Sequence, residues 1–401
     1  MSQTANEPIT DRPPVNADVT PQARPRRFNI PTEALRAYTM LFALVVIWGY
    51  FHYATDGIFL RPRNLSILLQ QMAVTGVLAV GMLMVIVAGQ IDLSVGSVVG
   101  LTGGIAAILM TWQDWGLVPA LLAAVGAGVL IGAVQGALVA YANIPAFIVT
   151  LGGLLAWRGA IKGISVGNTI PVGLPSFKAI GNSYVAPSIG IALGVIAIAA
   201  LLVMNVRRKR ARQRHGLAGE SMLNMSARVI IPAVVVIGFV YVMNSYAGLP
   251  IPVIILLAVA LLGAFVTQNT TFGRYLYAIG GNPDAARLSG ISLRRHILAV
   301  FCLMGALAGV AATIFTSRVG SASPDAGVLL ELDAIAACVI GGASLMGGRG
   351  TIFGACLGAL IMASIDNGMS LLNTPDYRQD IIKGAILVAA VGFDMLGRRR
   401  G

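Results

Sequence analysis

The side chains of this chain that could do chemistry are few, and the most unusual are polar groups set among long apolar runs. Asp92 stands in the stretch AGQIDLSVGS, residues 88–97, between apolar runs on both sides. Asp366 and Asn367 stand towards the end of another apolar run, in MASIDNGMS. A carboxylate at the centre of a bilayer costs about 2.5–3.5 kcal/mol on insertion scales, so the protein must compensate for it.

A helix N-terminus is one means of compensation for Asp92, since it stabilises a partly buried carboxylate by up to about 2 kcal/mol. Gly89 permits a break in the helix, and Asp92 would then cap the next helix by accepting from the backbone N–H of Ser94 or its successor. Two alternatives stay open, namely a residue that lines or gates a pathway and a residue that binds a ligand directly. The small neighbours are expected to cap, to hydrogen-bond between helices or to pack closely: Ser94, Ser97 and Gly96.

The other intramembrane polar groups lie towards the C-terminal end. We expect Asp366 and Asn367 to line the outer mouth of a pathway or to cap a turn. Lys383 is expected to snorkel to the membrane surface, with Asp380, three residues away, as its alternative partner.

The elements that carry these groups must be membrane helices. Of the 401 residues, 57% are hydrophobic and only 11% are charged, whereas soluble domains carry about 25% charged residues. Mean hydropathy is +0.82. Twelve apolar runs, each a candidate span, lie between residues 38 and 397, and the pattern predicts an all-α polytopic membrane protein with ten to twelve transmembrane helices. The short Gly-rich run 334–348 suits a half-span or re-entrant segment.

Charge divides the chain into segments. Residues 1–37 are polar and Pro-rich and are predicted to form a disordered cytoplasmic tail, followed by a transmembrane domain at 38–397 and a cytoplasmic C-terminus at 398–401. Of 28 basic residues, the tail holds five, the loop 206–228 seven, the loop 269–296 four and the C-terminus three. This distribution follows the positive-inside rule and predicts that both termini lie in the cytoplasm. The net charge of +12 is therefore explained by membrane topology, which argues against nucleic acid as a partner.

Nothing in the sequence predicts an enzyme, a cofactor or a metal site. The three cysteines form no C-x-x-C pair, and the three histidines are scattered. The stretch GASLMGGR, 342–349, approximates a phosphate-binding loop, but Gly348 replaces its lysine and Arg349 its metal-binding hydroxyl. The polar loops are too short to bury a core of their own. We therefore expect no ATP hydrolysis by this chain.

The loop 269–296 contains a helix signal of its own. Asn282 is a good N-cap, Pro283 suits the first helical position and Asp284 suits the helix dipole, so a short helix is predicted from Pro283 to Leu288 or Ser289, ending at Gly290. Ala285 and Ala286 would give this helix a small, smooth exposed face. Two readings remain open on these features alone, an ordinary connector or a helix that docks into a groove on a cytoplasmic partner.

The same loop carries a resemblance. Asp284-Ala-Ala-x-x-x-Gly290 resembles the E-A-A-x-x-x-G coupling motif of ABC importer permeases, with Asp in place of Glu. Four blocks in order resemble the permeases of monosaccharide importers, nearest to the D-xylose branch of the ribose/xylose permease family. They are GMLMVIVAGQIDLSVGS (81–97), YAIGGNPDAARLSGI (277–291), ELDAIAACVIGG (331–342) and MASIDNGMS (362–370). Gln90 departs from the Gly or Glu of many relatives, and we assign it no fixed role.

The resemblance implies a division of labour. Two permease chains would form a homodimer in the inner membrane lipid, a separate ATP-binding cassette ATPase would dock on the cytoplasmic side, and a periplasmic sugar-binding protein would deliver D-xylose. Ribose or another pentose or hexose is the alternative substrate, and an ion-coupled secondary transporter the alternative mechanism. The residues implied in coupling to the ATPase are Gly280, Asn282, Asp284, Ala285, Ala286, Ser289 and Gly290.

Overall fold

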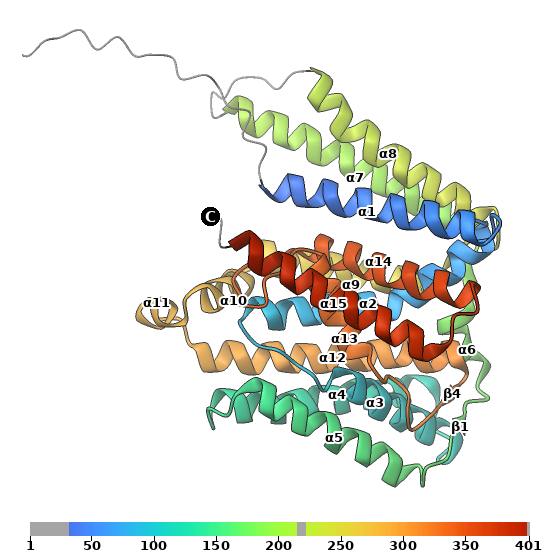
Figure 1. Cartoon of the computed structure of the whole chain (residues 1–401), viewed down its shortest axis with the longest axis vertical. Coiled ribbons are helices and arrows are strands. Elements are labelled where there is room, and N and C mark those ends of the chain that lie inside the picture. The colour runs from blue at the N-terminus through green and yellow to red at the C-terminus, as the bar shows by residue number, and fades with distance from the viewer. Residues whose placement is uncertain (1–31, 215–221, 399–401) are drawn as a thin grey trace, which may run out of the picture.

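The structure is a computed structural model and describes residues 32–214 and 222–398. Its helices run roughly along one common axis (Figure 1), and the described strands pair antiparallel, β1 with β4 and β2 with β3. In chain order the elements are α1 (Thr32–Ala54), α2 (Pro62–Val87), α3 (Val95–Thr111), α4 (Leu117–Ala140), α5 (Ala146–Ile164), β1 (Ile170–Pro171), α6 (Pro175–Asn182), β2 (Tyr184–Val185), α7 (Pro187–Arg214), α8 (Met222–Asn244), β3 (Leu249–Pro250), α9 (Ile251–Asn269), α10 (Thr271–Gly281), α11 (Pro283–Leu288), α12 (Leu293–Val319), β4 (Ser321–Ala322), α13 (Leu330–Ile340), α14 (Ile352–Leu371) and α15 (Asp376–Arg398).

Long apolar helices dominate this arrangement. Within the described ranges, seven helices are long and apolar enough to cross a membrane, and three shorter apolar helices accompany them, at Tyr38–Ala54, Val95–Thr111 and Arg228–Asn244. The predicted all-α polytopic membrane fold is confirmed. The seven helices of spanning length reach the predicted ten only together with the three shorter apolar helices of the described residues.

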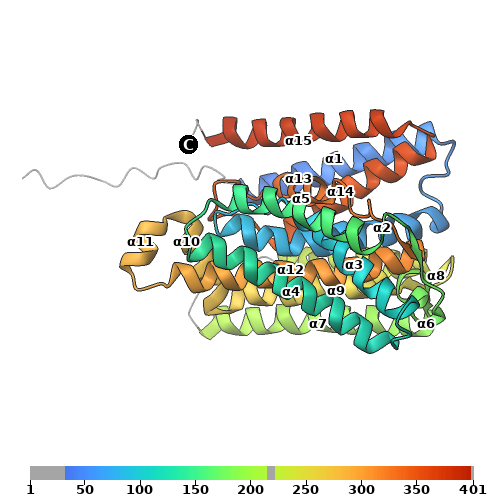
Figure 2. The ribbon, with the colours of Figure 1, turned by 90° about the horizontal axis from the view of Figure 1, so that it is seen from below.

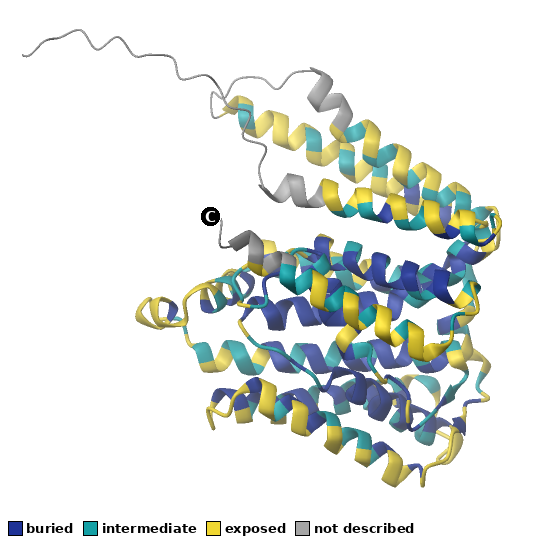
Figure 3. Ribbon diagram, in the orientation of Figure 1, coloured by how far each residue is buried: buried dark blue, intermediate teal, exposed yellow. Residues whose placement is uncertain are grey.

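One helix, α2, lies at the centre. Its most apolar window is 94% buried, and α9, α12, α13 and α14 pack around it. A helix that is apolar on all sides needs such a position. The hairpin of α7 and α8 lies at the margin and is largely exposed (Figure 3), as expected for helices whose neighbours are lipid. The core is therefore built around the element that leads directly to Asp92.

Two spans are interrupted. α2 ends at Val87 and α3 begins only at Val95, while α12 ends at Val319 and α13 begins only at Leu330. Each long helix is thus followed by an irregular segment, a shorter helix and another long helix, and α2 and α12 run in opposite directions along the bundle (Figure 1). The break after α2 is largely buried, whereas the segment after α12 is exposed at Asp325 and Val328. Membrane proteins tolerate irregular backbone where it is buried in protein or lines a water-filled space. The predicted half-span or re-entrant segment at 334–348 is confirmed in part: its first half belongs to the 11-residue helix α13, Leu330–Ile340, and the rest, from Gly341, is a turn.

Two predicted loop boundaries need correction. α1 begins at Thr32, inside the predicted tail, and the rest of that tail lies outside the described residues. α7 continues to Arg214 and α8 begins at Met222, so much of the predicted loop 206–228 is helical. Arg and Lys are good helix formers, and helix propensity extends α7 beyond its apolar part. The intervening residues 215–221 lie outside the described part.

The loop 269–296 also holds more helix than predicted, because α10 occupies its first third. The Thr270 hydroxyl accepts from the Gly273 N–H at 3.2 Å and so caps α10. Leu276 and Ile279 are buried on one face of this helix, the spacing of an amphipathic helix. This apolar stripe is too short to be recognised in a sequence by looking for runs of membrane-spanning length. Because α10 leads directly into the predicted docking helix, it sets the position of that helix.

Candidate functional site

The carboxylate of Asp92 lies in the break between α2 and α3. Its Oδ1 accepts from the Ser94 backbone N–H at 2.9 Å and from the Ser94 hydroxyl at 2.6 Å, and the side chain is buried. Gly89 has φ +76°, a conformation that glycine adopts readily, so the chain can turn out of α2 there. The predicted hydrogen bond to the Ser94 N–H is confirmed, and Asp92 is satisfied at the entry to α3.

Ser94 and Ser97 tie α3 to its neighbours. The Gln135 amide nitrogen on α4 donates to the Ser94 hydroxyl at 2.9 Å, and the Ser97 hydroxyl donates to the Leu154 carbonyl on α5 at 2.8 Å. Ser94 occupies the N-cap position of α3, but its own side chain makes no capping hydrogen bond, and its hydroxyl donates to Asp92 instead. The predicted interhelical hydrogen bonding of both serines is confirmed, and a capping role for the Ser94 side chain is wrong.

A second buried acid, Glu331, stands in the first turn of α13. Its Oε2 has no hydrogen-bond partner among the residues that the structure describes. The side chain interacts electrostatically with Arg158 and Asp92. A Cβ at Gly96 would overlap both Glu331 Oε2 and the Gly327 carbonyl, so the predicted close packing at Gly96 is confirmed. The N-terminal ends of the two interrupted helices therefore meet, each with a carboxylate beside it.

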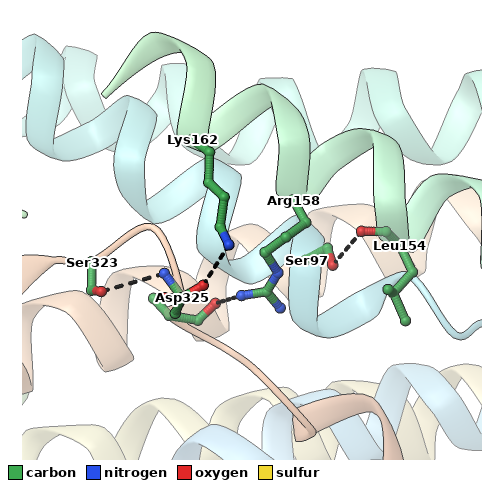
Figure 4. Close-up of polar contacts among 7 residues, drawn as sticks. Ser97, Leu154, Arg158, Lys162, Ser323 and Asp325 are labelled. Carbon is green, nitrogen blue, oxygen red and sulfur yellow. Dashed lines mark hydrogen bonds and ion pairs between the residues drawn. The ribbon is translucent and has the colours of Figure 1, made fainter. Parts of the chain in front are cut away.

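A polar cluster on α5 was not predicted from the sequence. Arg158 donates to the Ala326 carbonyl at 2.9 Å, and Lys162 pairs with Asp325 at 3.0 Å. The Asp325 N–H donates to the Ser323 hydroxyl at 3.3 Å. Figure 4 shows these α5 side chains reaching across to the irregular segment before α13. Two basic residues four positions apart, hence on one face of the apolar run 145–163, were the available signal.

This cluster marks a face that is unsuited to lipid. The side chains of Lys162 and Asp325 are 53% and 68% exposed, although α5 is otherwise a candidate membrane span. Charged groups on such helices face a bundle interior or a water-filled space. The rest of the exposed side of α5 is apolar, for example at Ile148 and Leu155, and Lys162 stands in its last turn. The C-terminal end of α5 is therefore the candidate polar site beside a pathway.

Asp366 joins three helices through a charge cluster. Lys383 Nζ on α15 lies 3.0 Å from Asp366 Oδ1 on α14 and 3.3 Å from Asp333 Oδ2 on α13. Only 20% of the Lys383 side chain is exposed. The expectations that Lys383 snorkels to the surface or pairs with Asp380 are wrong, because the carboxylates of two neighbouring helices lie within its reach.

Asn367 is buried and fastens α14 to α2. Its Oδ1 accepts from Asn64 at 2.8 Å, and its amide nitrogen donates to Gln71 at 3.3 Å. It lies inside α14, so the expectation that Asn367 caps a turn is wrong. Interhelical amide bonds of this kind hold membrane helices together.

The predicted docking helix is present as α11, from Pro283 to Leu288. The Asn282 side chain accepts from the Ala285 N–H at 2.9 Å, so the predicted N-cap is confirmed. At the other end Gly290 has φ +82° and the Ser289 hydroxyl donates to the Ala285 carbonyl at 2.9 Å.

The C-terminal end of α11 is closed by a Schellman motif. The Gly290 N–H donates to the Arg287 carbonyl at 3.0 Å and the Ile291 N–H to the Ala286 carbonyl at 3.1 Å. Ala285 is exposed but Ala286 is buried, so the expectation of two exposed alanines is half wrong. Ala286 lies on the face that turns towards the bundle. A helix of six residues is held rigid by caps at both ends.

Glycines join this helix to the rest of the protein. A Cβ at Gly280 would overlap the Val87 carbonyl and lie 2.8 Å from the Gly348 nitrogen. The Gly348 N–H donates to the Val87 carbonyl at 2.9 Å, and Tyr277 donates to the Gly350 carbonyl at 2.7 Å. We call this contact of α10, the end of α2 and the 341–350 turn the glycine junction. It connects α11 to the ends of both α2 and α13.

The predicted site residues thus fall into three groups. Asp92, Ser94, Gly96 and Ser97 lie together at the break, and Gly280 to Gly290 lie together around α11, which projects from one end of the bundle (Figure 2). Asp366 and Asn367 form the third group, near the start of α15. Among the described residues no cluster of three His, Cys, Asp or Glu side chains could hold a metal ion.

Comparisons with known proteins agree with this architecture. The pattern of the protein family described as "Branched-chain amino acid transport system / permease component" matches residues 64–391. A xylose transport system permease protein, XylH, of Haemophilus influenzae is 44% identical over 93% of this chain and 100% of its own length. XylH of Escherichia coli is 46% identical over 91% of this chain and 93% of its own. The E. coli ribose import permease RbsC is 36% identical over 84% and 87%.

No solved structure matches the chain significantly. The family pattern covers most of the chain, including both interrupted spans and α11. The relatives align over nearly their whole length, so the similarity concerns the complete membrane domain. This chain belongs to the family of transport-system permease components, and it is a multi-pass membrane protein.

Proposed function

We propose that this chain is the membrane-spanning permease of an ATP-driven importer that carries D-xylose across the inner membrane. The observation that carries the proposal is α11, a short helix capped at both ends that projects from the bundle and is 89% exposed at Leu288. An ion-coupled carrier has no need of such a helix. A permease that is moved by a separate ATPase needs a rigid contact at this place.

The proposed coupling runs through the glycine junction. An ATP-binding cassette ATPase docks on α11 by way of Asp284, Ala285 and Ser289. Its movement reaches the ends of α2 and α13 because Gly280 touches backbone of both neighbouring segments. The permease itself is not catalytic, and ATP hydrolysis belongs to the ATPase partner.

The sugar is inferred from the relatives. The two relatives named as xylose permeases are 44% and 46% identical to this chain, against 36% for a ribose import permease. D-xylose is accordingly the favoured substrate, and ribose or another pentose or hexose is the alternative. A periplasmic sugar-binding protein selects the sugar and delivers it.

The proposed pathway passes the polar C-terminal end of α5, at Arg158 and Lys162. In a homodimer, two copies of Arg158, Lys162 and Asp325 would face a shared water-filled space, which explains charged groups on a membrane helix. Asp92 sets the shape of this pathway through α3, a role supported by the two hydrogen bonds that its Oδ1 accepts from Ser94, and a direct contact with the sugar is the alternative. Asp366 lies near the start of α15, towards the outer mouth. Both termini and α11 lie on the cytoplasmic side.

Ion coupling is the second candidate mechanism, with Asp92 or Asp366 as the proton- or sodium-binding carboxylate. It accounts for neither α11 nor the glycine junction, and Asp366 is engaged by Lys383 at 3.0 Å.

Docking is tested by substitution at Gly290. Proline fixes φ near −65° and lacks the N–H, so Gly290→Pro removes both the φ of +82° and the hydrogen bond to Arg287. Gly290→Asn is the matched control, because asparagine tolerates this conformation. We expect the proline variant to insert normally but to fail to co-purify with the ATPase, while the asparagine variant co-purifies. Normal assembly of the proline variant would contradict the docking role of α11.

A further inference from the structure

A groove of about 520 Å³ lies between α4 and α12. Its lining is apolar apart from one charged residue, Arg295, at the end where α12 begins; Val129 contributes from α4, and Ala299, Cys302 and Ala306 contribute from α12. Leu130, next to Val129, is 68% exposed, so this side of the bundle faces outward. The groove is open to whatever surrounds the bundle there, which for a membrane helix is lipid.

The groove exists because α4 and α12 cross closely through glycine. A Cβ at Gly128 would overlap the Gly305 carbonyl, and a Cβ at Gly305 would overlap the Gly128 carbonyl. Beside this crossing, the small side chains of Ala299 and Ala306 leave space that larger residues would fill. Small residues at the crossing bring the backbones together and leave a furrow beside them.

The dimensions of the groove suit one acyl chain. From Arg295 to Ala306 the helix rises about 17 Å at ~1.5 Å per residue. Half of a bilayer's hydrocarbon thickness is about 15 Å. The groove therefore runs from the level of the headgroups to the bilayer midplane, with its only charge at the headgroup end.

The charge at that end is uncompensated. Arg294 and Arg295 stand in the first turn of α12, which has no acidic residue, and the Ser292 side chain makes no capping hydrogen bond. Cations are unfavourable beside the positive end of a helix dipole. Arg295 makes no hydrogen bond or ion pair with any other residue in the part of the chain that the structure describes. A phosphate group would satisfy both the guanidinium and the free N–H groups.

We infer that this groove is a binding site for an anionic phospholipid, with its phosphate at Arg295 and one acyl chain along Ala299, Cys302 and Ala306. Basic pockets between membrane helices recognise anionic headgroups in this way. The bound lipid would stabilise the start of α12, which follows α11 in the chain. This role does not depend on which partner docks on α11.

The experiment measures lipid binding to the purified permease in neutral detergent, without ATPase, by native mass spectrometry. Phosphatidylglycerol is compared with phosphatidylcholine, and inorganic phosphate tests whether the headgroup alone suffices. We expect preferential binding of phosphatidylglycerol and slower maleimide labelling of Cys302 in its presence. Arg295→Gln should weaken phosphatidylglycerol binding about fivefold, the factor expected for one basic residue at an anionic surface. Arg294→Gln is the matched control, since Arg294 does not line the groove, and should leave binding unchanged.

A second variant tests the acyl chain. Ala306→Leu fills the deep end of the groove and should weaken binding of both phospholipids. Equal binding of the two lipids by the unaltered protein, equal losses in the Arg294 and Arg295 variants, or binding of inorganic phosphate as tight as that of the lipid would each overturn the inference. Efficient oxidative cross-linking of Cys302 between two chains would assign the groove to a second copy and overturn it too.

Discussion

The glycine junction gives a sharp prediction, because two adjacent glycines of α10 differ completely in their surroundings. A Cβ at Gly280 would overlap the Val87 carbonyl and press on the Gly348 nitrogen. A Cβ at Gly281 would meet nothing within 4 Å. Both residues lie in the same helix. The main difference between their alanine variants is therefore the contact of the new Cβ with Val87 and Gly348.

The expected magnitudes follow from that difference. Overpacking usually lowers the free energy of unfolding by about 1–3 kcal/mol. The loss for Gly280→Ala should lie in the upper half of that range, because the neighbours of the new Cβ are backbone atoms that cannot rotate away. Gly281→Ala should be neutral or gain less than the about 0.5–1 kcal/mol expected in the middle of a helix, because Gly281 is the last residue of α10. The two variants should therefore differ by about 3 kcal/mol in the free energy of unfolding.

Two assays check this prediction. Thermal unfolding of the purified permease should show a lower midpoint for Gly280→Ala and an unchanged or higher midpoint for Gly281→Ala. In proteoliposomes with the ATPase and binding protein, only Gly280→Ala should lose ATPase stimulation. If both variants behave alike in the two assays, the close contact at Gly280 does not hold α10 against α2, and the reasoning is refuted.

Three further changes have defined outcomes. Asn282→Ala should destabilise α11 by about 1 kcal/mol and weaken ATPase docking, while Asn282→Ser should dock normally in the same co-purification; equal docking of both would argue against the cap. Lys383→Met leaves buried carboxylates without a cation and should lower the unfolding midpoint, because an uncompensated buried charge destabilises the fold. Adding Asp366→Asn removes one of these charges and should partly restore the midpoint, and no recovery would contradict the role of Lys383. Asp92→Asn keeps an oxygen that can accept from Ser94 and should retain most sugar uptake, whereas Asp92→Ala should lower expression; complete loss of uptake in the asparagine variant would favour a coupling carboxylate.

Local signals in the sequence were sufficient for several elements. The cap, the proline and the terminal glycine of α11 act within a few residues of each other, so its bounds follow from capping rules alone. The signals for the break at Asp92 are likewise local, since Gly89 and Ser94 lie within three residues of Asp92 in the sequence. The half-span near 334–348 was visible as a run too short to cross the bilayer.

Partners that are distant in the chain could not be predicted. Lys383 bonds across 50 residues to Asp333, and Arg158 bonds across 168 residues to Ala326. A sequence without aligned relatives carries no record of such pairings, so Lys383 was assigned to the surface by default. α10 was missed for a different reason, because its apolar stripe is amphipathic and not continuous.

Uptake of radiolabelled D-xylose into proteoliposomes tests the central claim most directly. The permease is reconstituted with its ATPase and periplasmic binding protein, and each component, ATP and the ion gradient is removed in turn. Uptake that requires ATP and both partners and that persists with an uncoupler is the predicted result. Uptake that continues without the ATPase and collapses with the uncoupler would contradict the proposal that this chain is the permease of an ATP-driven importer.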